Sequence, residues 1–432
     1  MDSIYRSLGY NMQTDNIYAF ILGNNKALSL AELAMVLKRE EFIFVVLSIT
    51  ATVAIIKTDK NIFEPQKMLD RMGGIIKIIQ LEKLGSTHSI KDRIFDKIKK
   101  LDTSSKIVFG ISGYDWPYHS THQINGLGIN IKKNLAKARF VNLKEKTFLS
   151  SAEINRNQIL KKGLEICLLS DSQKQSIYLG QTLAIQNYLS YGLRDYKKPQ
   201  RDTKSGMLPP KLAQIMINLG SGSHQQNIFI YDPFCGTGTI LVEGLLSGHS
   251  VMGSDSSPEA IRQSKENIDN KKLDLHERQR ASISLFVQDA QSIDKIKLPQ
   301  NPNLVISELY LGPPLNFLPS DERIKNDTKK LIKLYLNFLK SVKRIHSIKT
   351  LVLAMPYYNS DKGPILLDII DEIDSIGYTR MDPLRGISVP AQFLAGFNQK
   401  RKTLLYAIPD QIVGREIIIL KKYEKIVEEI FS

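Results

Sequence analysis

The residues whose types and spacing best suit chemistry are the string DPFCGTGT, residues 232–239, which leaves an apolar strand and enters an apolar helix. Gly236 and Gly238 permit a tight turn and let a ligand approach the backbone closely. No lysine follows the second glycine, and no third glycine is present. The string therefore matches neither the phosphate loop GxxxxGK[ST] nor the three-glycine dinucleotide motif.

Two more carboxylates follow the next two expected strands, Asp255 in the string GSD and Asp289 in the string VQDA. A carboxylate after the second strand can accept hydrogen bonds from both ribose hydroxyls, as in dinucleotide sites. A carboxylate after the third strand can accept from an adenine amine. A single aspartate at such a place is usually a turn former or a helix cap. Three in register, counting Asp232, favour a ligand that contains a nucleoside.

The string DPFCGTGT resembles the first motif of S-adenosylmethionine-dependent methyltransferases that methylate amines. The resemblance implies S-adenosylmethionine as cofactor. It places the methionine part of the cofactor at the turn, with the ribose at Asp255 and the adenine at Asp289. The cofactor-binding residues that it implies in the turn are Asp232, Phe234, Gly236 and Gly238.

The fourth strand of that class usually ends in Asp-Pro-Pro-Tyr or Asn-Pro-Pro-Tyr, whose polar side chain accepts from the target amine while the ring stacks on the base. Here the strand runs into SELYLGPP, residues 307–314. We expect Glu308 to be the acceptor and Tyr310 the stacking ring, with Ser307 beside them as a third catalytic residue. The prolines come later than usual, so the spacing is altered. A changed substrate or a lost activity therefore stays open.

The N-terminal half resembles another part of one methyltransferase family. The string YAFILGNNKALSLAELAMVL, residues 18–37, is similar to the ferredoxin-like region of the archaeal and eukaryotic tRNA guanine-10 methyltransferase family. Residues 126–143 resemble the THUMP domain that follows it, and LPPKLAQIMINL resembles the entry into the catalytic domain. The resemblance implies a tRNA substrate, methylated on the exocyclic amine of a guanine. It leaves open a small activating partner subunit, and otherwise a monomer.

Charge agrees with a nucleic-acid partner. The net charge is +15, and most of the basic excess lies in residues 1–205. A localised basic excess is typical of nucleic-acid binding, although a lysine-rich solvated surface gives the same count. Tyrosines lie between basic residues in the stretch 188–208, which suits irregular RNA. The predicted RNA-binding residues are Lys132, Lys133, Lys137, Arg139, Arg194, Lys197, Lys198 and Arg201.

The order of apolar segments predicts an α/β protein. We expect a ferredoxin-like domain over 1–80, a THUMP-like RNA-binding domain over 81–185 and a linker over 186–208. Residues 209–432 alternate strands with helices, which favours a doubly wound, mostly parallel, Rossmann-like sheet. Two capping boxes are expected in the N-terminal half, Ser29 with Glu32 and Ser150 with Glu153.

Composition limits the setting of the protein. The two cysteines, Cys167 and Cys235, form no disulfide framework and no zinc spacing, so we expect no metal and a reducing compartment. The uncharged apolar run over residues 42–56 is 15 residues long, whereas a membrane helix needs about 20. The N-terminus lacks the pattern of a signal peptide. These features predict a cytoplasmic protein.

Two other functions remain open from the sequence. One is a DNA amino-methyltransferase acting on cytosine or adenine, although no segment for a target-recognition insert is evident. The other is a non-catalytic RNA-binding protein with a decayed methyltransferase domain. The string SELYLGPP favours decay, and the intact string DPFCGTGT opposes it.

Overall fold

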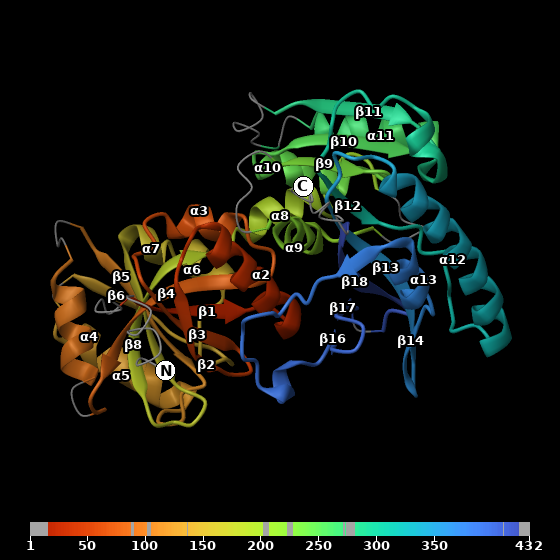
Figure 1. Ribbon diagram of the computed structural model, residues 1–432. Coiled ribbons are helices and arrows are strands. Elements are labelled where there is room, and N and C mark those ends of the chain that lie inside the picture. The colour runs from red at the N-terminus through yellow and green to blue at the C-terminus, as the bar shows by residue number, and fades with distance from the viewer. Residues whose placement is uncertain are drawn as a thin grey trace, which may run out of the picture. The chain divides into compact units, whose positions relative to one another are not determined.

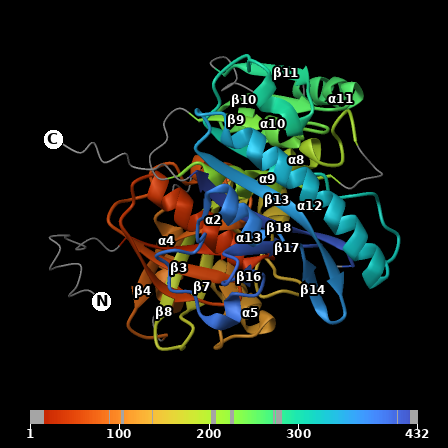
Figure 2. The ribbon, with the colours of Figure 1, turned by 45° about the vertical axis from the view of Figure 1, so that its right-hand side comes forward.

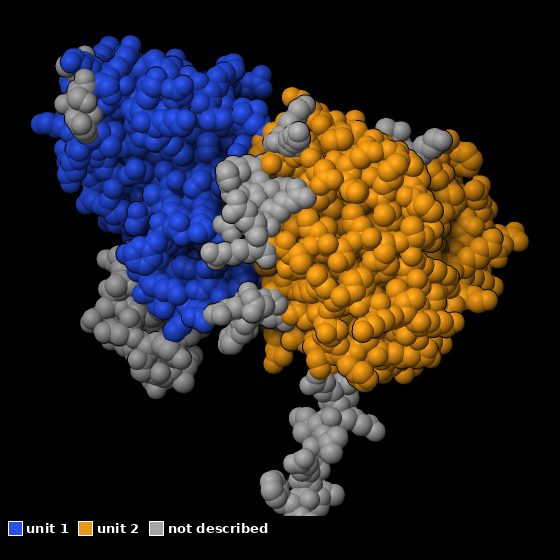
Figure 3. All heavy atoms as spheres, turned by 90° about the horizontal axis from the view of Figure 1, so that it is seen from above, with its two compact units in different colours: residues 1–189, 386–395 blue, residues 190–385, 396–432 orange. Residues whose placement is uncertain are grey.

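The computed structural model describes residues 16–87, 90–101, 105–135, 137–201, 207–222, 228–270, 273, 281–408 and 410–422. The chain separates into two compact units, which Figure 3 distinguishes by colour. Unit 1 comprises residues 1–189 and 386–395, and unit 2 comprises residues 190–385 and 396–432. Among the helices of the described ranges, none combines the length and the apolar character needed to cross a membrane.

Unit 1 is an α+β unit built on one sheet of eight strands (Figure 1). The strands occur in the order β2-β3-β1-β4-β8-β7-β5-β6, and only β5, β6 and β7 pair in parallel. Its elements are β1 Ile17–Leu22, α2 Lys26–Arg39, β2 Phe44–Ile49, β3 Val53–Thr58, α3 Pro65–Asp70, β4 Ile75–Leu84, α4 Ile90–Lys99, β5 Ile107–Tyr114, α5 Thr121–Lys133, β6 Ala138–Val141, α6 Ser151–Arg156, α7 Ile159–Lys162, β7 Gly163–Ser170 and β8 Ile177–Ile185.

The predicted domain boundary between residues 80 and 81 is wrong, because it falls inside β4. This strand pairs with β1 on one side and with β8 on the other. The segments expected to form a ferredoxin-like and a THUMP-like domain therefore share one continuous sheet. Backbone hydrogen bonds across β4 join them into a single unit.

One predicted capping box is confirmed and the other is wrong. Ser150 and Glu153 form a reciprocal capping box at the start of α6. The helix α2 instead begins three residues before the predicted cap, with Asn25 as its N-cap. Glu32 is fully buried in this helix, and its carboxylate accepts from the backbone N–H groups of Gly73 and Gly74, at 2.9 and 2.7 Å. It therefore satisfies a distant turn rather than its own helix end.

The stretch predicted as a linker begins with a helix, α8 Tyr188–Arg194. Tyr191 and Arg194 are buried, and the hydroxyl of Tyr191 hydrogen-bonds to the side chain of Gln214 in unit 2. Tyrosine and arginine carry long apolar parts beside their polar tips, so a polar sequence can still pack. Residues 202–206 of this stretch lie outside the described residues.

Unit 2 is an α/β unit built on a sheet of ten strands. Most of these strands are labelled in Figure 1. Its helices and strands alternate as the sequence predicts. Its elements are α9 Pro210–Gly220, β9 Phe229–Asp232, α10 Thr239–Leu246, β10 Ser250–Asp255, α11 Pro258–Ile268, β11 Ile283–Val287, the 3₁₀ helix η2 Ala290–Lys295, β12 Leu304–Glu308, α12 Asp321–Lys343, β13 Thr350–Ser360, β14 Gly363–Leu366, α13 Ile370–Ile376, β15 Tyr378–Arg380, β16 Phe397–Asn398, β17 Thr403–Tyr406 and β18 Val413–Lys422.

The main path of this sheet is β11-β10-β9-β12-β13-β18-β17-β16. The first five strands are parallel, whereas β18, β17 and β16 are antiparallel. Numbered along the chain, the parallel strands have the order 3-2-1-4-5 of a doubly wound sheet. The predicted fold class of the C-terminal half is confirmed.

Helices cover both faces of this sheet. Val305 and Leu351 belong to the apolar cluster that includes Tyr335 and Phe338 of α12, the long helix in Figure 2. The residues next to them along the strands, Leu304 and Val352, point to the opposite face. There they lie close to Gly220 of α9. The core is thus two apolar layers, and they fix the strand ends at one edge of the sheet.

Candidate active site

The candidate site lies where the strand order of the sheet reverses, between β9 and β12. In sheets of this kind the crevice beyond the carboxyl ends of these strands is where ligands bind. A cavity of about 730 Å³ occupies this place in unit 2. Seven of the predicted site residues line it: Asp232, Phe234, Gly236, Asp255, Asp289, Glu308 and Tyr310. The structure therefore brings together residues that are up to 78 positions apart in the chain.

The glycine turn has the backbone conformation that the sequence predicts. Gly236 has a φ of +49° and Gly238 a φ of +79°, a region that residues with a Cβ rarely adopt. Gly238 does not line the cavity but forms the N-cap of α10, where an added Cβ would lie 2.8 Å from Oγ of Ser264. Gly238 therefore shapes the turn, and its contact with a cofactor stays a prediction.

Side chains from the next strand and helix hold the turn in place. Asp255 accepts through Oδ2 from the backbone N–H of Gly236 at 3.0 Å, and through Oδ1 from that of Ser257 at 2.9 Å. On α11, Ser264 donates to the carbonyl of Gly236 and Asn267 to that of Thr237, both at 2.8 Å. Sequence reasoning missed Ser264 and Asn267, because neither stands in a motif.

Asp232 is a buried carboxylate at the end of β9, 2% exposed. Its Oδ1 accepts from Oγ of Ser307 at 2.6 Å and from the backbone N–H of Phe234 at 3.2 Å. Burial raises the pKa of Asp232 to about 7, and these hydrogen bonds only partly offset the effect. A cation bound in the cavity would favour the ionised form.

Ser307 does not meet its predicted catalytic role. Its side chain is fully buried and donates to Asp232, and Ser307 does not line the cavity. On a strand, neighbouring side chains point to opposite faces, so Ser307 and Glu308 cannot both face the same side. Ser307 is a positioning residue for Asp232.

Asp289 lies two residues beyond the end of β11 and acts as the N-cap of η2. Its Oδ1 accepts from the backbone N–H of Gln291 at 2.9 Å. It lines the cavity beside Gln291. Asp289 therefore caps a helix, as a lone aspartate often does, and it also faces the cavity, as the motif predicts.

Glu308 ends β12 with its carboxylate at the cavity. Its Oε1 accepts from Nε of Arg415 at 2.6 Å. Tyr310, two residues later, has an exposed ring (51%), and its carbonyl accepts from the hydroxyl of Tyr335 at 2.5 Å. The loop backbone is therefore fixed while the ring stays free to stack. Sequence reasoning missed Arg415, which lies 107 residues from its partner with no motif around it.

The structure divides the predicted RNA-binding residues into two groups. Arg194 is corrected to a structural residue: it is 9% exposed, and its Nε pairs with Glu243 at 2.7 Å. Arg139 donates to Asn157, and Lys198 donates to the hydroxyls of Thr237 and Thr239 beside the glycine turn. The residues left exposed are Lys132, Lys133, Lys137, Lys197 and Arg201.

Comparisons with known proteins agree with this geometry. Residues 197–360 match the family model of the RMKL-like methyltransferase domain, UPF0020. Over 172 residues the chain is 29% identical to a tRNA (guanine(10)-N2)-dimethyltransferase of Methanothermobacter thermautotrophicus, covering 40% of this chain and 44% of that protein. Over 84 residues it is 34% identical to the same-named protein of Methanocaldococcus jannaschii, covering 18% of this chain and 23% of that protein. The chain spans less than half the length of these curated relatives.

A solved structure supports the fold. The crystal structure of TrmN from Thermus thermophilus aligns with 94% of this chain and all of its own chain, at a TM-score of 0.50 and 13% identity. This likeness concerns the fold alone. The methyltransferase domain confirms the prediction of S-adenosylmethionine as the cofactor class.

Proposed function

Because residues 197–360 match the family model of the RMKL-like methyltransferase domain, we propose that the protein is an S-adenosylmethionine-dependent tRNA methyltransferase acting on the exocyclic amine of a guanine. The observation that carries the proposal is the cavity in which the strand-end carboxylates, the glycine turn, Glu308 and Tyr310 meet. The names of the curated relatives support the choice of substrate.

The donor set suits the cofactor. When bound, S-adenosylmethionine supplies a methyl group activated by a positively charged sulfur. Asp232 and the glycine turn would hold its methionine part, Asp255 the ribose and Asp289 the adenine. The buried Asp232 carboxylate gains from a cation nearby, which fits a sulfonium ligand.

Glu308 and Tyr310 would handle the target base. The carboxylate of Glu308 accepts hydrogen bonds from the amine and so orients its lone pair, and the ring of Tyr310 stacks on the base. Guanine offers its amine next to a ring N–H, so both groups donate to a carboxylate. Adenine and cytosine instead present a ring acceptor beside the amine, which an ionised carboxylate repels. Guanine is therefore the one of these three bases whose amine and neighbouring ring nitrogen are both hydrogen-bond donors.

Unit 1 is the proposed tRNA-binding part, together with residues 197–201. Lys132 and Lys133 are exposed in the last turn of α5, and Lys137 precedes β6. Such residues bind phosphates without reading sequence. The target nucleotide must leave its stack for its amine to reach Glu308 in the cavity.

Methyl transfer from radiolabelled S-adenosylmethionine to unmodified tRNA transcripts tests the proposal, with duplex DNA as the competing substrate. We expect label in tRNA only, recovered as N2-methylated guanosine after nucleoside digestion. Glu308→Gln should lower the rate of methyl transfer to tRNA by about 100-fold. Its affinity for the cofactor, measured by calorimetry, should stay within about twofold of the wild type. Label in DNA, or cofactor binding without label in tRNA, would overturn the proposed function.

A further inference from the structure

Arg415 stands out among the buried residues, because it is the largest fully buried side chain in the described ranges. It lies on β18, where it is 1% exposed and pairs with Pro356 of β13 and Tyr406 of β17. An arginine is rarely buried unless paired. Its side chain forms an ion pair with Glu308, which lines the cavity.

The contact is directional and leaves part of the carboxylate free. Nε of Arg415 donates to Oε1 of Glu308 at 2.6 Å, and Nη2 approaches the carbonyl of Met207 at 3.5 Å. Within the described part of the chain, Oε2 of Glu308 accepts no hydrogen bond. The side chain of Glu308 is 17% exposed and faces the cavity. One oxygen is therefore held by the protein and the other is available to a ligand.

We propose that Arg415 is a positioning residue that fixes Glu308 as an ionised hydrogen-bond acceptor for the target amine. The inference rests on the proposed function. Glutamate is one methylene longer than the aspartate or asparagine usual at this position, so its carboxylate has one more rotatable bond to fix. The bond from β18, two strands away from β12 in the sheet, to Oε1 restricts that freedom.

Charges around Glu308 agree with this role. Burial raises the pKa of Glu308, and the guanidinium of Arg415 is the largest opposing influence. Lys198 also lowers the pKa of Glu308. Among the described residues, Asp232 on β9 and Tyr335 on α12 are further titratable groups that interact with it. Arg415 is the group that donates directly to the carboxylate.

The test combines Arg415→Met and Arg415→Lys with Glu308→Gln in the full-length protein. Arg415→Met should lower the rate of methyl transfer to tRNA by about 100-fold and move the acid limb of the pH–rate profile to higher pH. Arg415→Lys keeps the charge, so it should restore the position of the limb but only part of the rate. In the double variant Glu308→Gln with Arg415→Met, the second change should add less than about threefold.

Arg401→Met is the matched control. Arg401 also pairs with a buried glutamate, Glu416, with the same 2.6 Å distance from Nε to Oε1, but neither residue lines the cavity. We expect the control to leave the acid limb in place. A similar shift in Arg401→Met, or full additivity in the double variant, would overturn the proposal.

A readout without turnover separates this inference from the proposed function. The infrared C=O band of protonated Glu308, assigned by its loss in Glu308→Gln, should persist to higher pH in Arg415→Met than in the wild type. An unchanged titration would refute the role of Arg415 even if tRNA is methylated. A shifted titration with no methylated nucleic acid would refute the proposed function alone. If Arg415→Met does not fold, Arg415→Gln, which keeps a polar side chain but removes the charge, decides by the same band.

Discussion

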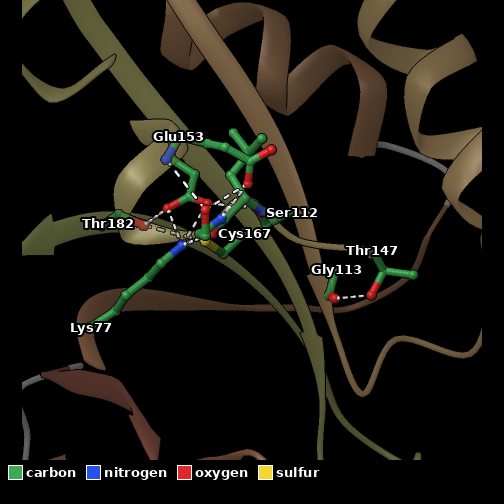
Figure 4. Close-up of polar contacts among 10 residues, drawn as sticks. Lys77, Ser112, Gly113, Thr147, Glu153, Cys167 and Thr182 are labelled. Atoms are coloured by element: carbon green, nitrogen blue, oxygen red, sulfur yellow. Dashed lines mark hydrogen bonds and ion pairs between the residues drawn. The ribbon is translucent and has the colours of Figure 1, made fainter. Parts of the chain in front are cut away.

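Two buried ion pairs, one in each unit, serve opposite purposes. In unit 1, Lys77 and Glu165 are 1% and 0% exposed, and Nζ of Lys77 donates to both carboxylate oxygens at 2.9 and 3.0 Å. Figure 4 shows Lys77, Ser112, Cys167 and Thr182 directed toward one another. Ser112 and Thr182 donate to Glu165, each at 2.5 Å, and Lys77 also donates to the carbonyl of Leu149 at 2.6 Å.

The pair in unit 2 is incomplete by comparison. Nη1 of Arg415 is buried without a hydrogen-bond partner in the described part of the protein, and Glu308 keeps one oxygen toward the cavity. A fully satisfied network makes a region rigid, whereas an incomplete one leaves a polar group to act on a ligand. The first pair joins β4, β5, β7 and β8, and the second presents a carboxylate to the proposed substrate.

The largest effect is expected from breaking the Lys77–Glu165 pair of unit 1. Lys77→Met leaves Glu165 buried without its cation, so the free energy of unfolding should fall by about 3–5 kcal/mol. Urea denaturation measures this, and calorimetric cofactor affinity reports on unit 2. The double variant Lys77→Met with Glu165→Leu should recover most of the loss. A single variant within about 1 kcal/mol of the wild type would show that the pair contributes little.

The pH dependence of the unfolding free energy tests the environment of Asp232 in the cavity of unit 2. Its pKa is about 7 in the folded protein and about 3.8 when exposed. The folded state therefore binds the Asp232 proton more tightly than the unfolded state does. The resulting stabilisation of the folded protein is fully present below about pH 4 and is lost as the pH rises through 7. Asp232→Asn removes the titration, so the difference in unfolding free energy should change by about 4 kcal/mol over pH 4–8. A constant difference would contradict the raised pKa of Asp232.

Ser307→Ala tests the positioning of Asp232. The change removes the 2.6 Å hydrogen bond to a buried carboxylate, so affinity for S-adenosylmethionine should weaken about 10-fold. Ser254→Ala is the control, because Ser254 is equally buried and bonds to the hydroxyl of Tyr231 instead. Equal losses in both variants would indicate a general packing effect.

The smallest effect is expected at the surface of unit 1. Replacing Lys132 and Lys133 by alanine should weaken tRNA binding by up to about 10-fold and lower the slope of log affinity against log salt by about 2. Lys329 and Lys330 are an exposed pair on α12 and give a matched control. Filter binding over a range of salt concentrations measures both. An identical slope for the two double variants would remove α5 from the proposed RNA surface.

The sequence by itself determined the residues of the cofactor turn and the register of the strand ends. Gly236 and Gly238 stand at positions whose positive φ angles favour glycine. The three aspartates stand at or just after the ends of apolar strands, and the pattern of each strand is local: Asp232, Asp255 and Asp289. Local conformational preferences and strand periodicity are encoded in neighbouring residues, so a single sequence suffices to predict them.

Only the tertiary structure decided which side chains meet across the sheet. Glu32 caps a turn 41 residues away, Arg194 pairs with Glu243 rather than with RNA, and Arg415 reaches Glu308 from a strand near the end of the chain. These partners are set by sheet order and by the face each strand presents. A buried charge must find its partner wherever packing places one, and no local pattern records that position.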